Sequence, residues 1–83
     1  MKLARDLSPK DMKGFLCLDH SRFREETAWR CTKENVVVML KGPEGVVVYR
    51  QVGDQNVTWT VKLSGDVPVA LVRYAIKQAE VQP

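Results

Sequence analysis

The sequence predicts an α+β domain in which an antiparallel sheet of three or four strands carries a short N-terminal helix and a C-terminal helix packed on one sheet face. In the second half of the chain, short β-branched runs alternate with turn signals at residues 42–45 and 53–56. Turns this close together leave no room for crossover helices, so the strands are expected to form an antiparallel meander. Residues 67–80 instead repeat their apolar positions at helical spacing.

The length of the chain sets the number of domains. Its 83 residues suffice for one domain and are too few for two, so residues 1–83 are expected to form a single unit. Residues 1–35 hold the first helix, an irregular segment and the first strand. Residues 36–83 hold the meander and the C-terminal helix.

The first predicted element is a helix that begins near Ser8. Ser8 can cap the helix, and Pro9 at the first helical position loses no hydrogen bond that the helix needs. Asp11, three residues after the cap, resembles the acidic half of a capping box. The apolar residues that follow fall at i, i+3 and i+4 and predict one buried stripe: Met12, Phe15 and Leu16.

The next region is irregular and leads into the first predicted strand. Residues 19–26 are polar apart from Phe23, which is typical of a loop or a short helical turn. Residues 27–31 alternate and predict a strand with Trp29 on its apolar side. Residues 32–35 are expected to form a turn.

Three further strands are predicted. Residues 36–40 are apolar on both faces, so this strand should lie centrally or be covered on both sides. Residues 46–49 follow the first turn and should leave Tyr49 half-buried beside Val47. Residues 57–63 alternate cleanly, and their inward side chains should be Val57, Trp59, Val61 and Leu63.

The C-terminal helix is predicted over residues 67–80, against the sheet face that bears Trp59. Asp66 is the expected cap, and Pro68 lies in the first turn. The apolar stripe that should face the sheet consists of Leu71, Val72, Ala75, Ile76 and Ala79.

Residues 59–72 resemble a strand-to-helix unit of a known group. The shared pattern is Trp59-Thr60, an apolar residue, a serine, an acid, Pro68, and then Leu71-Val72 on a helix. It is similar to an uncharacterised family of small domains from actinobacteria, their plasmids and their bacteriophages, and it covers about a fifth of this chain. That family has no assigned activity. The resemblance implies only an accessory protein of a phage or mobile element.

The charge distribution argues against a phosphate-binding face. The chain has 13 Lys and Arg against 10 Asp and Glu, a net charge of +3, and the two signs are interleaved almost throughout. A nucleic-acid interface would gather its cations without acids between them. The small excess is therefore expected to serve solubility.

Several features favour a soluble, cytoplasmic protein. Asp6 lies where a signal peptide needs its apolar run, and no apolar stretch approaches the ~20 residues of a membrane span. Cys17 and Cys31 agree with a reducing compartment, because small secreted domains usually carry more cysteines. They are expected to be buried free thiols, with one disulfide between them as the alternative.

The residue types that carry catalysis are present but badly spaced. Asp19, His20 and Ser21 are adjacent, and adjacent residues cannot adopt the geometry of a catalytic relay. Cys17, His20 and Cys31, even with Asp19, fall short of the closely spaced pairs that hold a structural zinc. No enzyme activity, metal or cofactor is therefore expected.

The candidate binding region places an aromatic residue between two arginines. Arginine and aromatic side chains are enriched at binding hot spots, so the candidate partner-binding residues are Arg22, Phe23, Arg24 and Arg30. The alternative is a solvated linker whose Phe23 tucks under the sheet. The expected function is that of a small non-enzymatic protein-binding accessory module, encoded by a phage or mobile element, that associates with a host protein or with itself. A nucleic-acid-binding regulator, suggested by the net charge and the arginines, is the alternative.

Overall fold

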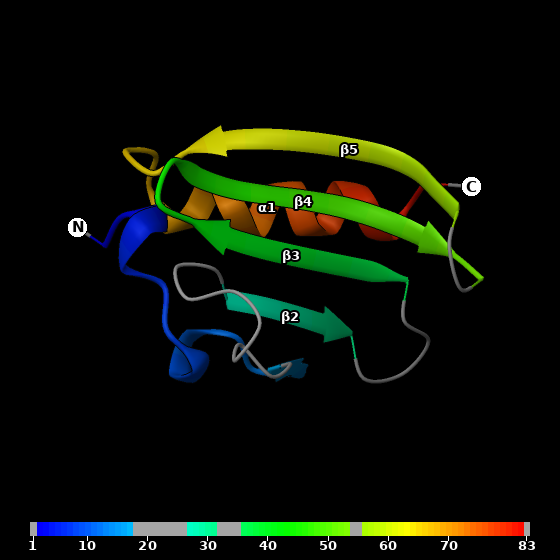
Figure 1. The fold of residues 1–83 in the computed structure, drawn as a ribbon, viewed down its shortest axis with the longest axis horizontal. Helices are drawn as coiled ribbons and strands as arrows, with labels where there is room; N and C mark the ends of the chain where they lie inside the picture. The colour runs from blue at the N-terminus through cyan, green and yellow to red at the C-terminus, as the bar shows by residue number, and fades with distance from the viewer. Residues whose placement is uncertain (1, 18–26, 32–35, 54–55, 83) are drawn as a thin grey trace.

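The protein is a two-layer α+β structure built on a five-stranded antiparallel meander. The computed structural model describes residues 2–17, 27–31, 36–53 and 56–82. The strands lie in chain order, and each pairs antiparallel with the next (Figure 1). In chain order the elements are the 3₁₀ turns η1 (Ala4–Asp6) and η2 (Pro9–Asp11), the strands β1 (Phe15–Cys17), β2 (Thr27–Cys31), β3 (Val37–Gly42), β4 (Gly45–Val52) and β5 (Asn56–Ser64), and the helix α1 (Val69–Glu80).

The predicted meander and the C-terminal helix are confirmed, but the strand count was too low. The sheet has five strands because residues 15–17 pair with β2, with Phe15 opposite Cys31 and Leu16 opposite Arg30. The predicted turn at residues 32–35 and the predicted loop at residues 19–26 lie outside the described residues.

The predicted N-terminal helix was wrong beyond its first turn. Its start forms as expected: the Ser8 amide and hydroxyl both donate to Asp11 Oδ2, each at 2.9 Å. The turn then ends, because Gly14 adopts a φ of +89°, a left-handed conformation that a helix cannot contain. Phe15 and Leu16 continue as a strand, so they point to opposite faces of the sheet, and Leu16 is 54% exposed.

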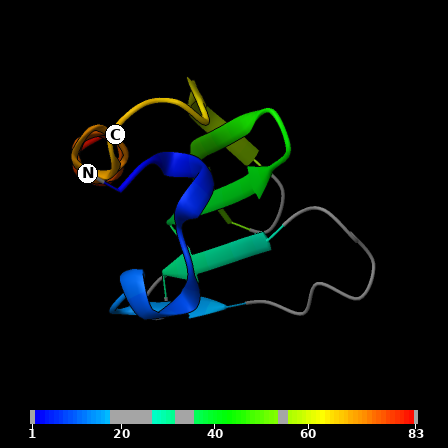
Figure 2. The same cartoon turned by 90° about the vertical axis from the view of Figure 1, so that its left-hand side faces the viewer.

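Both helical parts of the described chain lie on one face of the sheet. Figure 2 shows α1 and the N-terminal segment on the same side, with α1 packed chiefly on β4. The core lies between them and the sheet and is built from Ala4, Leu7, Met12, Trp29, Val37, Met39, Val46, Val48, Val69, Val72, Ala75, Ile76 and Ala79. Trp59, Val61 and Leu63 pack against its margin, as the sequence predicted. Within the described ranges, no helix combines the length and the apolarity needed to cross a membrane.

Two details of α1 differ from the expectation. Pro68 occupies the N-cap position without a side-chain cap, while Asp66 forms an ion pair with Arg5 instead. Leu71 does not face the sheet: it is 41% exposed, and Val69 is buried in the core. The buried stripe of α1 therefore begins at Val69, two residues earlier than expected, and does not include Leu71.

The central position of β3 in the sheet explains why its sequence has no polar side. β3 is the third of five strands, and Val37 and Met39 enter the core. Val38 is only 1% exposed although it points to the opposite face. The prediction of a central position is confirmed.

A register shift in the β4–β5 pairing changes one inward prediction. Arg50 pairs with Trp59, but the next residue, Gln51, pairs with Val57, so Thr58 is an extra residue on β5. Beyond this bulge Val57 is 54% exposed, contrary to the expected alternation.

Arg50 joins the sheet to the end of the helix. Its Nη1 atom lies 3.3 Å from the carbonyl oxygens of both Ala79 and Glu80. Those carbonyls belong to the last turn of α1, where the Ala79 oxygen also accepts the Gln82 amide at 3.3 Å. A cation at this end also opposes the negative pole of the helix dipole.

The first residues of the chain hold the start of α1. Leu3 forms an isolated antiparallel bridge with Pro68. The Ala4 amide donates to Val67 O at 2.8 Å, and the Val69 amide donates to Lys2 O at 3.1 Å. We call residues 2–7 the N-terminal tie.

An ion pair braces the tie against η2. Lys2 Nζ lies 2.8 Å from Asp11 Oδ2 and 3.0 Å from Oδ1. The hydrogen bond from Lys2, followed by those from the Ser8 amide and hydroxyl, lowers the pKa of Asp11 from its ordinary 3.8 to about 2.

The Asp11 contacts predict a pH dependence of stability. Because the pKa is lower in the folded protein than in the unfolded chain, their contribution is complete above pH 3.8 and is lost as the pH falls toward 2. Asp11→Asn should therefore lower the melting temperature at neutral pH, and the difference should shrink as the pH falls from 3.8 toward about 2. Thermal melts of the wild type and of Asp11→Asn across this pH range measure the difference in melting temperature. A deficit that stayed constant down to pH 2 would show that the Asp11 charge contributes nothing.

Candidate functional site

The predicted site residues divide between the described and undescribed parts of the chain. Arg22, Phe23 and Arg24 lie outside the described residues, so only Arg30 can be placed. Arg30 is on β2, half-buried, between Leu16 of β1 and Val38 of β3.

Only some of the residues considered for metal binding or catalysis can be placed in the structure. Asp19 and His20 also lie outside the described residues. Cys31 is a free thiol and is half-buried, where the sequence predicted a buried one. In the ranges that the structure covers, no three His, Cys, Asp or Glu side chains gather as a metal would require.

Arg30 belongs to a sheet surface turned away from α1, which we call the outer face. Side chains alternate along a strand, and Trp29 enters the core, so its neighbours Ala28 and Arg30 point outward. The cross-strand register extends these two positions into two rows. The rows are Leu16, Arg30, Val38, Tyr49 and Thr60, and Ala28, Leu40, Val47 and Lys62.

The outer face is mainly apolar and incompletely buried. Leu16 is 54% exposed, and Leu40, Val47 and Tyr49 are all half-buried. Neither α1 nor either 3₁₀ turn lies on this side. The sequence predicted that residues 36–40 lie centrally or are covered on both sides, and it did not predict an incompletely buried apolar face; the half-buried state of Tyr49 beside Val47 is confirmed.

Arg30 carries an unusual polar atom for such a surface. Three buried side-chain nitrogens of the described residues lack a hydrogen-bond partner: Trp29 Nε1, Arg30 Nε and Arg50 Nε. Trp29 and Arg50 belong to the face covered by α1, so only the Arg30 atom is on the outer face. A buried N–H without an acceptor is destabilising.

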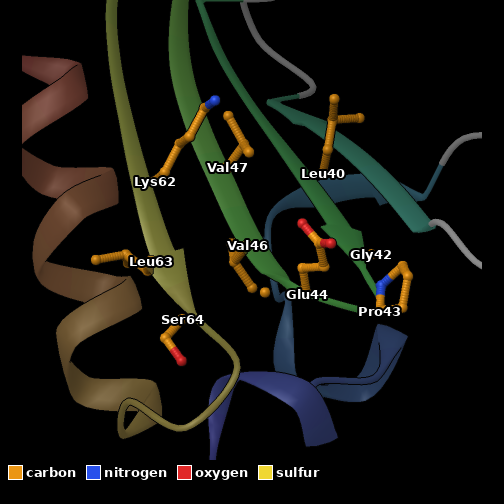
Figure 3. A pocket seen from close by; sticks show the side chains of 10 residues that line it. Leu40, Gly42, Pro43, Glu44, Val46, Val47, Lys62, Leu63 and Ser64 are labelled. Carbon is orange, nitrogen blue, oxygen red and sulfur yellow. The ribbon is translucent and has the colours of Figure 1, made fainter.

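A hollow lies at one end of the outer face, beside the β3–β4 turn (Figure 3). It has a volume of about 480 Å³. In Figure 3 Leu63 points toward α1, while Val47 and Lys62 stand on the other side of the sheet, and Glu44 rises from the turn between them and Leu40. The hollow is lined mainly by apolar side chains with one acid and one base, which can orient a partner but do not form an acid–base or nucleophile–base pair.

The remaining cations of the sheet are engaged elsewhere. Lys41 Nζ donates to Leu7 O at 2.9 Å, and Arg50 holds the end of α1. Both are on the face covered by α1. In the described part of the sheet, the outer face therefore presents only Arg30 and Lys62 as positive groups, too few to follow a nucleic-acid backbone.

Comparison with models of protein families, with curated proteins and with solved structures finds no match to this chain.

Proposed function

We propose that this protein is a small non-enzymatic protein-binding module that docks on a partner protein through its outer face. The observation that carries the proposal is that, among the described residues, α1 and the N-terminal segment pack on one face of the sheet, while the opposite face is mainly apolar and includes the exposed Leu16 and the half-buried Leu40, Val47 and Tyr49. Burial of such side chains stabilises a complex by ~1.5–3 kcal/mol for each Leu or Val that becomes fully covered.

The polar groups of the outer face fit recognition of a protein. Arg30 and Tyr49 flank Val38 in one cross-strand row, and arginine and tyrosine are the side chains most often found at hot spots. The guanidinium of Arg30 carries hydrogen-bond donors that suit a backbone carbonyl or carboxylate of a partner. Glu44 and Lys62 at the hollow add one charge of each sign.

We also propose a biological setting for this module. The resemblance of residues 59–72 to small actinobacterial and phage domains supports an accessory role for a phage or mobile element, in the cytoplasm. The alternative, a nucleic-acid-binding regulator, is less well supported because the outer face presents so few cations.

The test compares two equivalent substitutions at exposed apolar residues. Leu16→Glu changes the outer face, while Val81→Glu changes a 73% exposed residue just after α1 and serves as the control. Tagged proteins are used to recover partners from cells of the source organism, and recovery is quantified by mass spectrometry. A specific partner should be retained by Val81→Glu and reduced about tenfold or more by Leu16→Glu, since a fully buried Leu contributes ~1.5–3 kcal/mol.

A second variant tests the polar contact. Arg30→Met keeps most of the aliphatic stem but removes the guanidinium, and it should also reduce recovery of the same partner. If both outer-face variants retained every partner as the control does, the outer face would not be the binding site. Retention of nucleic acid that weakened steeply with salt would favour the alternative function instead.

A further inference from the structure

A second surface of the protein is a long sheet edge that no described strand pairs with. β5 runs for nine residues along one side of the sheet and bonds only to β4, whereas the other edge strand, β1, has three residues (Figure 1). Its one charged side chain is Lys62. Proteins usually shorten, charge or cover such edges, because their free N–H and C=O groups accept another strand.

The strand register shows which backbone groups are free. Along an antiparallel strand, alternate residues bond to one neighbour and then to the other. The pair Gly42 and Gly45 closes the two-residue turn between β3 and β4, so the backbone of Gly45 bonds to β3. Because the bonding side alternates along β4, the backbone of Val48 bonds to β5, where its partner is Val61. By the same alternation, the N–H and C=O groups of Thr60 point away from the sheet.

An apolar strip accompanies this edge on the side of α1. Because α1 packs chiefly on β4, it leaves Trp59, Val61 and Leu63 only partly buried. The flank of α1 beside them carries Leu71 and Tyr74, which are 41% and 60% exposed. The other flank faces the N-terminal segment and is charged.

We infer that this edge pairs with the β5 edge of a second copy of the chain, around a two-fold axis at Thr60. Thr60 is the middle residue of β5, so antiparallel pairing about it aligns residues 59–61 of the two copies in regular register, up to the bulge at Thr58. Trp59 then lies opposite Val61 of the copy, an aromatic and β-branched pair that stabilises sheets. Lys62 lies opposite Thr58, so no like charges meet, and the two five-stranded sheets become one continuous sheet.

Exposed apolar side chains of α1 lie beside this edge and add to the contact. The gap beside the paired strands is filled by Leu71 and Tyr74 of both copies. This inference concerns a different surface from the outer face and does not depend on the proposed function.

The first test removes the hydrogen bond at the axis. Thr60→Pro deletes an N–H that points away from the sheet, which an edge strand tolerates, while Thr60→Val keeps the N–H and serves as the control. Sedimentation equilibrium over a hundredfold range of concentration should show dimers for the wild type and for Thr60→Val. Thr60→Pro should weaken the dimer by about tenfold or more.

A second pair of variants leaves the strand intact in case proline disturbs folding. Tyr74→Lys and Glu80→Gln each raise the net charge by one, but they lie on opposite flanks of α1. Tyr74→Lys should weaken the dimer because the two copies bring this residue together, and Glu80→Gln should not. A wild-type protein that stayed monomeric throughout, or a Tyr74→Lys dimer as tight as that of Glu80→Gln, would overturn the inference. Neither result would bear on partner recovery through the outer face.

Discussion

Val72→Asp is expected to unfold the protein, whereas Leu71→Asp, one residue earlier on α1, is expected to leave it folded. Val72 is 1% exposed and lies within the core between α1 and the sheet. A carboxylate there would have neither water nor a partner cation, and burying an unpaired charge costs several kcal/mol. The whole stability of a domain of this size is only ~5–15 kcal/mol, so little margin remains.

Leu71→Asp is the matched control because it introduces the same group on the same helix. Leu71 is 41% exposed, and its aspartate would remain hydrated. The expected change in the free energy of unfolding is ~0.5 kcal/mol or less, measured at a dilution where the chain is monomeric. Circular dichroism and thermal melts distinguish the two variants. Equal melting temperatures for Val72→Asp and Leu71→Asp would show that the buried face of α1 is assigned wrongly.

Gly45→Ala is expected to destabilise the protein strongly although it adds a single methyl group. Gly45 has a φ of +149°, and a Cβ atom there would overlap the carbonyl oxygen of Leu63 and lie 3.0 Å from Gly65 N. Both obstacles are backbone atoms at the β4–β5 pairing, so relief requires the strands to move apart. We expect a loss of ~3 kcal/mol or more, combining the backbone conformation with overpacking.

Gly53→Ala isolates the conformational part of that effect. Gly53 also has a positive φ, +68°, but a Cβ atom there would meet nothing within 4 Å. Its replacement should cost only the ~1–2 kcal/mol of holding a non-glycine residue in the left-handed region. Urea unfolding of the two variants gives both values. If Gly45→Ala were no worse than Gly53→Ala, the close approach of β4 to the β5–α1 connection would not be tight.

The parts of the fold that could be predicted from sequence are those with strong local signals. The Gly42-Pro43-Glu44-Gly45 turn and the alternation over residues 57–63 predicted a hairpin and a strand, and both form. The lack of a polar side in residues 36–40 predicted a central strand, and β3 occupies the middle of the sheet. These features depend on backbone chemistry and on side-chain period, which neighbouring residues determine.

The errors arose where distant contacts decide the outcome. The i, i+3, i+4 spacing of Met12, Phe15 and Leu16 fits a helix, and three residues are too few to reveal the alternation of a strand. Pairing with β2 and the left-handed conformation of Gly14 make residues 15–17 a strand instead of a helix. On α1, the stripe from Leu71 to Ala79 is wider than the buried face. Only the placement of α1 over β4 reveals that Leu71 lies beyond its edge.

The outer face could be foreseen in part. Its apolar character follows from β3. Arg30 was selected only as a residue type common at hot spots, and the strand register places it on that face. The contribution of Leu16 could not be foreseen, because it depends on β1 being a strand. Arg22, Phe23 and Arg24 lie outside the described residues and remain predictions.

The N-terminal tie connects parts of the chain that are far apart in sequence, and this has a consequence for chain entropy. Each described hairpin closes a loop of a few residues, whereas the Leu3–Pro68 bridge closes one that spans most of the chain. Loop-closure entropy rises by only ~0.6 kcal/mol per doubling of length, so this closure costs ~2–3 kcal/mol more than a tight turn. Three backbone hydrogen bonds of ~0.5–1.5 kcal/mol each, from the amides of Ala4, Arg5 and Val69, offset it. We therefore expect the meander to assemble from neighbouring contacts first, and the tie to gain its bonds after the sheet has brought the start of α1 within reach of the first residues.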